Sequence, residues 1–388
     1  MADADNAALW EDGANRMRTR IDETAAALDS GFPHWANADT GKWTTTPDGD
    51  WTGGAWPGML WLAHRATGEQ NYLRLARTWA ARMRPRALRE TAFKGFGFYC
   101  GNAVGEILTG DAEARALALE AAASLRARYD ERLGLIPLGR EAEEHAEVGT
   151  AVSSIDSLQA TPLLFWAAAK TGEASYRDCA VAHTSRVLDL HMLDDGSVIQ
   201  STELDAGTGV LRRRFTHKGY SDTSVWGRAQ AWAALYAAMA LIREPWQTRW
   251  MQQGQKILDW WLDHVPDSGV AFWDFSDPAI PDTETDTAAT SIVCAALLKF
   301  AGVAPAREDR ARYVAAARHS AASLVTRFVT PVGSADKRPP GRLVGACFNK
   351  RPDARPQDSA SNVETIFGDY FLFEALCVLT TVVKAHEI

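Results

Sequence analysis

Residues 67–83 read TGEQNYLRLARTWAARM, and versions of this phrase recur along the chain. A Thr-Gly pair, an acidic residue and an amphipathic stretch return as TGDAEARALALEAAASLRARY at residues 109–129 and as TGEASYRDCAVAHTSRVLDLHM at residues 171–192. Weaker copies lie at residues 246–265 and 307–328, and residues 6–28 share their pattern. Apolar residues at helical spacing, with charges on the opposite face, are typical of a helix packed on one side. The repeat therefore predicts half-exposed outer helices at these positions.

A more uniformly apolar helical pattern precedes each internal copy and returns near the end of the chain. These apolar stretches lie at residues 57–66, 100–108, 157–170, 230–242, 290–302 and 368–383. A helix that is apolar all round is a buried helix. Six buried helices that alternate with six half-exposed ones predict an all-α protein, an (α/α)6 double-ring helical barrel in which residues 1–388 form a single domain.

The connections between the predicted helices are unequal in length. Outer helices lead into inner ones through long segments at residues 31–54, 130–155, 194–225, 266–285 and 330–364, whereas the return turns are short. Long connections within a compact domain usually carry function. These segments must meet at the end where the inner helices begin, and helix N-termini favour anions. We therefore expect the functional site at that end, with an affinity for anionic groups.

Composition argues against several classes of function. The chain of 388 residues has 41 Lys and Arg against 49 Asp and Glu, a formal net charge of −8. Nucleic acids and anionic membranes need a basic face, so we expect neither as a partner. Residues 1–17 lack a signal-peptide pattern, and the five cysteines lack metal-ligand spacing. We expect a cytoplasmic protein with no metal site and no other cofactor, acting as a monomer or a homodimer.

The residues just before the inner helices combine aromatic rings, cations and carboxylates. They are Trp51, Trp56, residues 94–98 (KGFGF), Asp156, residues 217–232 (HKGYSDTSVWGRAQAW), Asp286, Glu364 and Asp369. Aromatic faces stack on sugar rings, Arg and Lys bind carboxylates, and an acid can move a proton. The set therefore indicates a site for an acidic sugar.

Each of these residues also has a structural interpretation. Asp156 occupies the position of a helix N-cap, and capping is a common use of Asp there. Arg228 could pair with a carboxylate such as Asp222. His217 could be a hydrogen-bonded loop residue, and each Trp could simply fill the core. What favours the functional interpretation is that all of them converge on one end.

Three stretches resemble the unsaturated glucuronyl hydrolases, family 88 of the glycoside hydrolases. They are DWTGGAWPGMLWLA at residues 50–63, SSIDSLQATPLLFWAA at residues 153–168 and THKGYSDTSVWGRAQAW at residues 216–232. The resemblance covers most of the chain and implies the (α/α)6 barrel of the six-hairpin glycosidases. Such enzymes remove the 4,5-unsaturated uronic acid that polysaccharide lyases leave on an oligosaccharide, by hydrating its C4=C5 double bond without a cofactor. The resemblance implies Asp156 as the acid/base, with Trp51, Trp226, Arg228 and Trp232 at the substrate.

The chain departs from the family pattern at four positions of the same rim. Gly95 replaces the family's second Asp, Gln200 a histidine, Lys218 a glutamine and Ala55 an aromatic residue. Such changes on a retained scaffold indicate an altered substrate or altered chemistry.

Two of the rim residues bring ammonium groups to a pocket that is largely neutral in the family pattern. We expect Lys94 and Lys218 to contact an anionic substrate, to lower the pKa of Asp156 and to hold that carboxyl ionised. The other substrate-binding residues that we predict are Gln200, His217 and Tyr220.

The leading interpretation is hydrolysis of an unsaturated glucuronyl oligosaccharide, an anionic ligand. A lyase acting by β-elimination on a uronic acid is an alternative, with Tyr220 or Asp156 as the base and Arg228, Lys218 or His217 neutralising the enolate. A hydrolase of saturated uronides and a carbohydrate-binding homologue without turnover are further alternatives. The absorbance of the C4=C5 chromophore separates them, because the first reaction consumes it and the lyase creates it.

Overall fold

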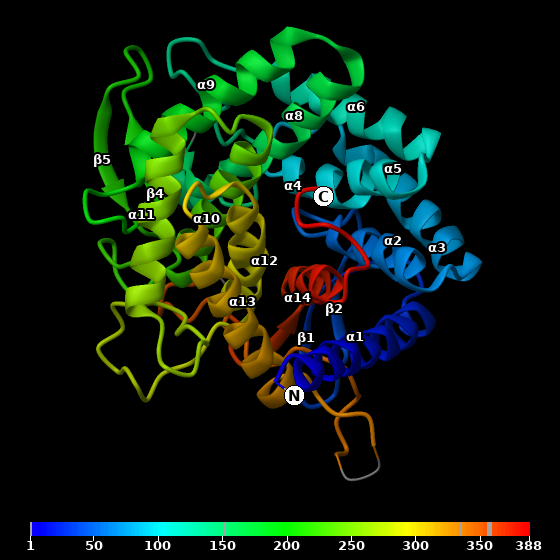
Figure 1. Ribbon diagram of the computed structural model, residues 1–388. Coiled ribbons are helices and arrows are strands. Elements are labelled where there is room, and N and C mark those ends of the chain that lie inside the picture. The colour runs from blue at the N-terminus through cyan, green and yellow to red at the C-terminus, as the bar shows by residue number, and fades with distance from the viewer. Residues whose placement is uncertain (1, 150–151, 334–335, 355–358) are drawn as a thin grey trace.

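The computed structural model describes residues 2–149, 152–333, 336–354 and 359–388, and it is mostly helical (Figure 1). The half-exposed helices are α1 (Ala2–Ala27), α3 (Gln70–Arg82), α6 (Ala112–Arg126), α9 (Ala174–His191), α11 (Thr248–His264) and α13 (Arg307–Arg327). Each coincides with one copy of the sequence repeat, so the prediction of these helices is confirmed.

The apolar helices alternate with them along the chain. They are α2 (Ala55–Thr67), α4 (Lys94–Phe98), α5 (Val104–Thr109), α8 (Ala160–Thr171), α10 (Gly227–Arg243), α12 (Thr287–Val303) and α14 (Ile366–Leu379). A π-helix, η2 (Tyr99–Ala103), joins α4 to α5, and a 3-10 helix, η3 (Ile155–Gln159), leads into α8. Two short elements, η1 (Arg84–Arg86) and α7 (His145–Val148), lie in connecting segments.

The apolar helices contact one another in a cyclic order. Helix α2 packs on α14, α14 on α12, α12 on α10, and α10 on α8. Helix α8 packs on α4 and η2, and η2 packs on α2, which returns to the starting helix. The half-exposed helices lie outside this succession, α1 against α14, α3 against α2, α6 against η2, α9 against α8, α11 against α10 and α13 against α12 (Figure 1).

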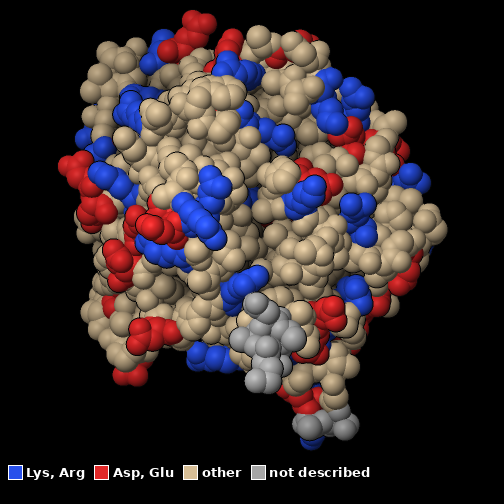
Figure 2. Space-filling view, in the orientation of Figure 1, with Lys and Arg blue, Asp and Glu red and all other residues tan. Residues whose placement is uncertain are grey.

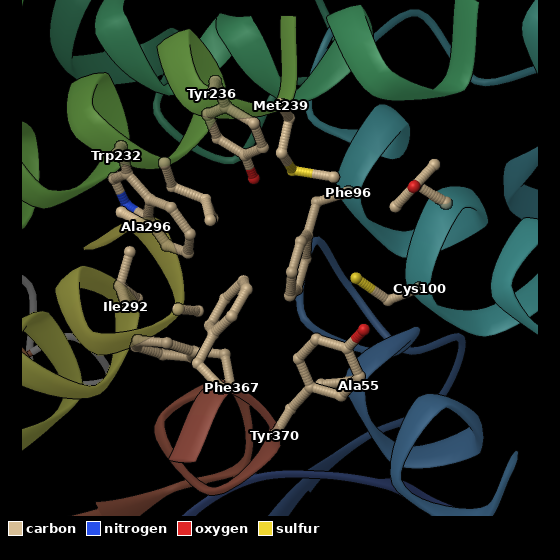
Figure 3. Packing of buried hydrophobic residues seen from close by; sticks show 14 of the residues in the cluster. Ala55, Phe96, Cys100, Trp232, Tyr236, Met239, Ile292, Ala296, Phe367 and Tyr370 are labelled. Carbon is tan, nitrogen blue, oxygen red and sulfur yellow. The ribbon is translucent and has the colours of Figure 1, made fainter. Parts of the chain in front are cut away.

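Large side chains fill the space between the apolar helices. Figure 3 shows Phe96, Trp232, Tyr236, Phe367 and Tyr370 pointing toward one another from α4, α10 and α14, and all five are buried. Trp232 and Tyr236 stack with ring centroids 5.7 Å apart, and Phe96 meets Trp232 edge-on at 5.9 Å. The middle of the helices is therefore a packed core, and a site at their N-terminal end has an aromatic floor.

The recurring Thr-Gly pair forms the short turns from apolar to half-exposed helices. Gly68, Gly110 and Gly172 end α2, α5 and α8 with φ of 77°, 73° and 75°. This left-handed backbone favours glycine, which has no Cβ to clash. In the turn after α8, the Thr171 hydroxyl donates to the Ala167 carbonyl and accepts from the backbone N–H of Glu173. The repeated Thr-Gly-acidic sequence thus ends one helix and begins the next.

Two small antiparallel sheets, which the helical periodicity did not predict, order the long connections. One has the order β2–β1–β6, with β1 (Phe32–Asn37), β2 (Trp43–Thr46) and β6 (Val363–Thr365). The other has the order β3–β4–β5, with β3 (Val152–Ser154), β4 (Ser201–Leu204) and β5 (Leu211–Phe215). The all-α prediction omits these strands. Segments that cross the ends of a helical bundle must still satisfy their backbone groups, and here they do so by pairing with each other.

The surface carries charges of both signs. On the face shown in Figure 2, Lys and Arg lie among Asp and Glu and form no continuous basic patch. In the part of the chain that the structure describes, no helix is long and apolar enough to cross a membrane. The five cysteines are buried, free thiols, as expected for structural residues.

Candidate active site

A narrow cavity lies where the apolar helices begin. Its lining consists of Trp51, Phe93, Glu144, Asp156, Gln159, Lys218, Trp226, Arg228, Trp232 and Phe348. These residues come from segments that precede α2, α4, α8, α10 and α14 and from the first turns of α10, so four of the long connections meet at this end, as expected. A wider groove nearby includes the exposed Arg213 and Asp353. Buried acids, cations and aromatic rings occur together in the narrow cavity, which is therefore the candidate active site.

Asp156 lies at the start of η3, immediately after strand β3. Ser154 is the N-cap of this 3-10 helix, and its hydroxyl oxygen lies 3.3 Å from the Asp156 backbone nitrogen. The same hydroxyl donates to Asp156 Oδ2 at 2.7 Å. Capping is therefore done by Ser154, and the interpretation of Asp156 as the N-cap is wrong. The buried Asp156 carboxyl is left to line the cavity.

The surroundings of Asp156 favour its protonated form. Burial raises its pKa to about 6, and the negative charge of Glu144 adds to this rise. The Ser154 hydrogen bond and the charges of Lys218 and His217 act in the opposite direction. The expectation that lysines hold this carboxyl ionised is wrong, because burial and Glu144 outweigh the cations. A carboxyl with this pKa retains its proton in weakly acidic solution, as a general acid requires.

Glu144 is a residue that the sequence did not single out. Its Oε1 lies 3.0 Å from Lys218 Nζ and its Oε2 lies 3.1 Å from His217 Nε2. Burial raises the pKa of Glu144, but Lys218 and His217 outweigh burial and hold that pKa well below its usual range. The positive charge that Lys218 brings to the cavity is therefore matched by a negative one.

Gln200 supports the segment that holds Lys218. Its Oε1 accepts from the backbone N–H groups of His217 and Lys218, at 3.2 Å and 3.0 Å. Sheet β3–β4–β5 brings these parts together, because Ser154 pairs with Ser201 and Ser201 pairs with Phe215. Gln200 is buried behind the cavity and is not part of its lining, so its predicted contact with a substrate is replaced by a supporting one.

Arg228 is fixed at the start of α10. Its Nη1 donates to the Cys347 carbonyl at 2.9 Å and lies 3.2 Å from Asp286 Oδ2, and its Nη2 donates to the Phe348 carbonyl. The guanidinium also lies over the Trp226 ring, 4.6 Å from its centroid. The structural interpretation of Arg228, pairing with a carboxylate, is confirmed, but the partner is Asp286, the N-cap of α12, and Asp222 pairs with Arg351 instead.

Several buried polar atoms of the lining have no partner among the described residues. They are Oε1 of Gln159 and the indole N–H groups of Trp226 and Trp232. A buried polar atom without a partner is unfavourable, and such atoms in a cavity favour a ligand rich in hydroxyl groups. No group of three or more His, Cys, Asp or Glu side chains within the described residues could hold a metal ion.

Known proteins resemble the whole of this chain. No family model matches it. The unsaturated glucuronyl hydrolase of Bacillus sp. (strain GL1) is 29% identical over 350 residues, 89% of this chain and 90% of that protein. A crystal structure of the Bacillus sp. GL1 enzyme matches with a TM-score of 0.86 at 28% identity, covering 95% of this chain and 96% of that one. The unsaturated chondroitin disaccharide hydrolase of Streptococcus pyogenes serotype M1 is 26% identical over 89% of this chain and 84% of that protein. Over most of its length, the chain is therefore similar in sequence and in fold to the unsaturated glucuronyl hydrolases.

Gly95 is one of the four departures from the pattern of the unsaturated glucuronyl hydrolases, and the site leaves no room for a side chain there. A Cβ at Gly95 would lie 2.3 Å from the Gln159 carbonyl oxygen and 2.6 Å from Ala160 Cα. Helix α4 therefore packs directly on the backbone of η3, the element that carries Asp156. An Asp at this position would require that backbone to move.

Lys94 does not reach the cavity. Its Nζ donates to the carbonyls of Ala87 and Arg89 at 3.0 Å and 2.8 Å, and to the Ser124 hydroxyl of α6. Burial lowers the pKa of Lys94 to about 7. The predicted contact of Lys94 with a substrate is wrong, because its long side chain runs between α4 and the outer helix α6.

Tyr220 and His217 also lie outside the lining. The Tyr220 side chain is 46% exposed, and its backbone N–H donates to Asp274 Oδ2 at 2.8 Å. Tyr220 was a candidate substrate contact and a candidate base of a lyase. In this structure it is not part of the lining of the narrow cavity, so the geometry supports neither role. His217 instead lines the wider groove, with Nε2 3.1 Å from Glu144 Oε2 and Nδ1 2.9 Å from the Ser201 hydroxyl.

Sequence reasoning placed Trp51, Trp226, Arg228, Trp232 and Lys218 at the rim, and all five line the cavity. It missed other lining residues, Phe93, Glu144, Gln159 and Phe348. A signal existed for Gln159, since it follows Asp156 by three residues and shares its helical face. Glu144 and Phe348 lie in long connections that were flagged as functional, but nothing in the sequence separates them from their neighbours.

Proposed function

We propose that this protein is a glycoside hydrolase that removes a 4,5-unsaturated uronic acid from the non-reducing end of an oligosaccharide, with Asp156 as general acid and base. The observation that carries this proposal is a buried carboxyl with a pKa of about 6 in an aromatic-lined cavity. The relatives support the class of substrate, since they are named unsaturated glucuronyl and unsaturated chondroitin disaccharide hydrolases. A solved relative with 27% identity and a TM-score of 0.85 is described with dGlcA-Glc-Rha-Glc.

The proposed reaction adds water across the C4=C5 double bond. Protonated Asp156 donates its proton to C4, and positive charge develops on C5 and the ring oxygen. A water molecule then attacks C5 and gives its proton to the Asp156 carboxylate, which restores the acid. The product carries a hydroxyl on C5 next to the ring oxygen, so the ring opens and the neighbouring sugar leaves. One buried carboxyl can serve both proton transfers, because a pKa of about 6 lets it give up a proton and take one back near neutral pH.

The lining residues supply binding. We infer that the rings of Trp51, Trp226 and Trp232 pack on the sugar, and that the unpartnered Gln159 Oε1 accepts from a sugar hydroxyl. Lys218 and Arg228 are the cations of the lining, each beside a carboxylate, and we infer that their N–H groups donate hydrogen bonds to the uronate carboxylate.

We infer that the cyclic packing of the apolar helices is an (α/α)6 barrel and that residues 1–388 form one catalytic domain. A hydrophobic cluster that extends from Trp10 to Ile388 supports this inference. The cytoplasmic location, the absence of a cofactor and the choice between monomer and homodimer stay predictions.

The test is the ultraviolet absorbance of the conjugated double bond in the presence of the purified protein. Unsaturated disaccharides from several uronic-acid polymers are the substrates, with the intact polymers alongside. We expect the absorbance to fall, and Asp156→Asn to slow the fall by about 10²–10⁴-fold, the range lost with a general acid or base. A rise in absorbance on an intact polymer would instead indicate a lyase. Release of sugar without an absorbance change would indicate a hydrolase of saturated uronides.

A further inference from the structure

Glu144 is a second carboxylate in the lining, and the proposed reaction does not use it. It comes from the connection between α6 and β3, whereas Asp156 comes from η3. Glu144 is 5% exposed, and a buried carboxylate is costly unless cations and hydrogen bonds compensate it. Burial of the Glu144 carboxylate therefore indicates a role other than solubility or surface packing.

Two contacts fix the Glu144 carboxylate in place. Lys218 Nζ lies 3.0 Å from one oxygen and His217 Nε2 lies 3.1 Å from the other. Gln200 in turn binds the backbone of both partners, and Lys218 Nζ lies over the Phe348 ring, 5.6 Å from its centroid. The carboxylate cannot rotate without losing one of its contacts, so Glu144 presents a fixed negative charge to the cavity.

Charged side chains from two connecting segments act on the Asp156 carboxyl. Glu144 faces it from the segment before α7, and Lys218 and His217 face it from the segment before α10. Tyr236 on α10 is a further ionisable side chain that interacts with Asp156. Arg228 lines the same cavity, but Asp286 pairs with it. Among the described residues, Glu144 is therefore the acid whose negative charge raises the pKa of Asp156.

We propose that Glu144 is a positioning residue for the reaction: its fixed negative charge keeps the proton on Asp156, so that Asp156 meets the substrate as an acid. This inference rests on the proposed function of Asp156. The charge of Glu144 acts in the same direction as burial, and together they outweigh Lys218 and raise the pKa of Asp156. Gly95 leaves no space for a carboxylate from α4, and Glu144 brings one into the cavity from a different segment.

The test is the pH dependence of kcat/KM for Glu144→Gln. This variant keeps the shape of the side chain and removes its charge. Because the protonated form of Asp156 is the active one, kcat/KM falls as the pH rises through the pKa of Asp156. Without the negative charge that pKa drops, and we expect the alkaline limb of the profile to move down by about one pH unit. Glu144→Asp retains the charge, and we expect its limb to stay near that of the wild type.

Lys218→Met removes the positive charge of the Lys218–Glu144 pair and leaves Glu144 unchanged. We expect its alkaline limb to move to higher pH, and the limb of the double variant with Glu144→Gln to return toward the wild-type position.

The matched control is Glu141→Gln, the same substitution in the same segment. Glu141 lies outside the cavity and accepts from the Glu90 backbone N–H, so its profile should not move. If Glu144→Gln lowered kcat/KM at all pH values without moving the alkaline limb, Glu144 would have only a structural role in its ion pair, and the proposal would be overturned.

A titration without substrate separates this inference from the proposed function. Carbon-13 NMR of labelled Asp carboxyls, with Asp156→Asn identifying the signal, gives the pKa of Asp156 directly. A lower pKa in Glu144→Gln supports the role of Glu144 even if no substrate is turned over. An unchanged pKa contradicts it even if the enzyme is active.

Discussion

The carboxyl of Asp156 is buried in a cavity whose surroundings penalise its ionised form. Its pKa rises from an ordinary value of 3.8 to about 6 on folding, so the folded state binds a proton more tightly than the unfolded state does. The stability that comes from this protonation is complete below about pH 4 and is lost as the pH rises through 6. Above that pH the wild-type protein carries a buried negative charge on Asp156, which lowers its stability.

Asp156→Asn, which should slow the reaction, should therefore be more stable than the wild type in neutral solution. The amide has the same shape and never ionises, so at pH 8 we expect a gain of up to about 3 kcal/mol in the free energy of unfolding. At pH 4 the wild-type carboxyl is largely protonated, and the gain should nearly vanish. Urea unfolding of both proteins at the two pH values measures it. An equal difference at both values would mean that the pKa of Asp156 is not raised.

The residues of the site differ in how far the sequence could predict them. Trp51, Trp226 and Arg228 lie just before predicted inner helices. The helical periodicity was therefore enough to predict that they lie at the N-terminal end of those helices. The partner of Lys218 did not follow, because Glu144 lies 74 residues away in sequence and meets it only through the pairing of three short strands. Lys94 was misplaced for a related reason, since a long side chain can turn to either face of its helix.

At the scale of the elements, the Thr-Gly turns account for much of what the sequence predicted correctly. Their signal is local, because a positive φ and a hydroxyl cap need only adjacent residues. The strands of sheets β2–β1–β6 and β3–β4–β5 lacked such a signal. Each is six residues or fewer, and its pairing partner is supplied by a distant segment, so strand formation depends on the tertiary fold.

The turn after α8 provides a quantitative test of this local signal. At Gly172, φ is 75° and a Cβ would meet nothing within 4 Å, so only backbone strain opposes a side chain. We expect Gly172→Ala to lower the free energy of unfolding by about 1 kcal/mol. Gly302 near the end of α12 also has open space but no positive φ, and Gly302→Ala should raise stability by roughly 0.5–1 kcal/mol. Thermal unfolding that gave both variants the same sign would contradict this account of the turns.

At the scale of the whole molecule, the first and last helices must meet if the succession of helices is to close. Arg20 on α1 donates from Nε and Nη2 to the two oxygens of Glu364 on β6, both at 2.7 Å. This strand leads directly into α14, and Arg20 also lies over the Trp43 ring, 4.9 Å from its centroid. Burial and the charge of Glu364 raise the pKa of Asp369 well above its usual range, so Asp369 keeps its proton and the guanidinium compensates the charge of Glu364.

Removing this cation tests whether the chain unfolds as one domain. Arg20→Met leaves Glu364 buried without its partner, and we expect a loss of about 3–5 kcal/mol in the free energy of unfolding. The control is Arg312→Met, which breaks the solvent-exposed pair of α13 with Asp259 on α11 and should cost about 1 kcal/mol or less. If α1 closes a single cooperative domain, circular dichroism and tryptophan fluorescence must shift together in Arg20→Met. An early transition seen by circular dichroism alone would mean that α1 melts separately, and that the remaining helices hold the active site without it.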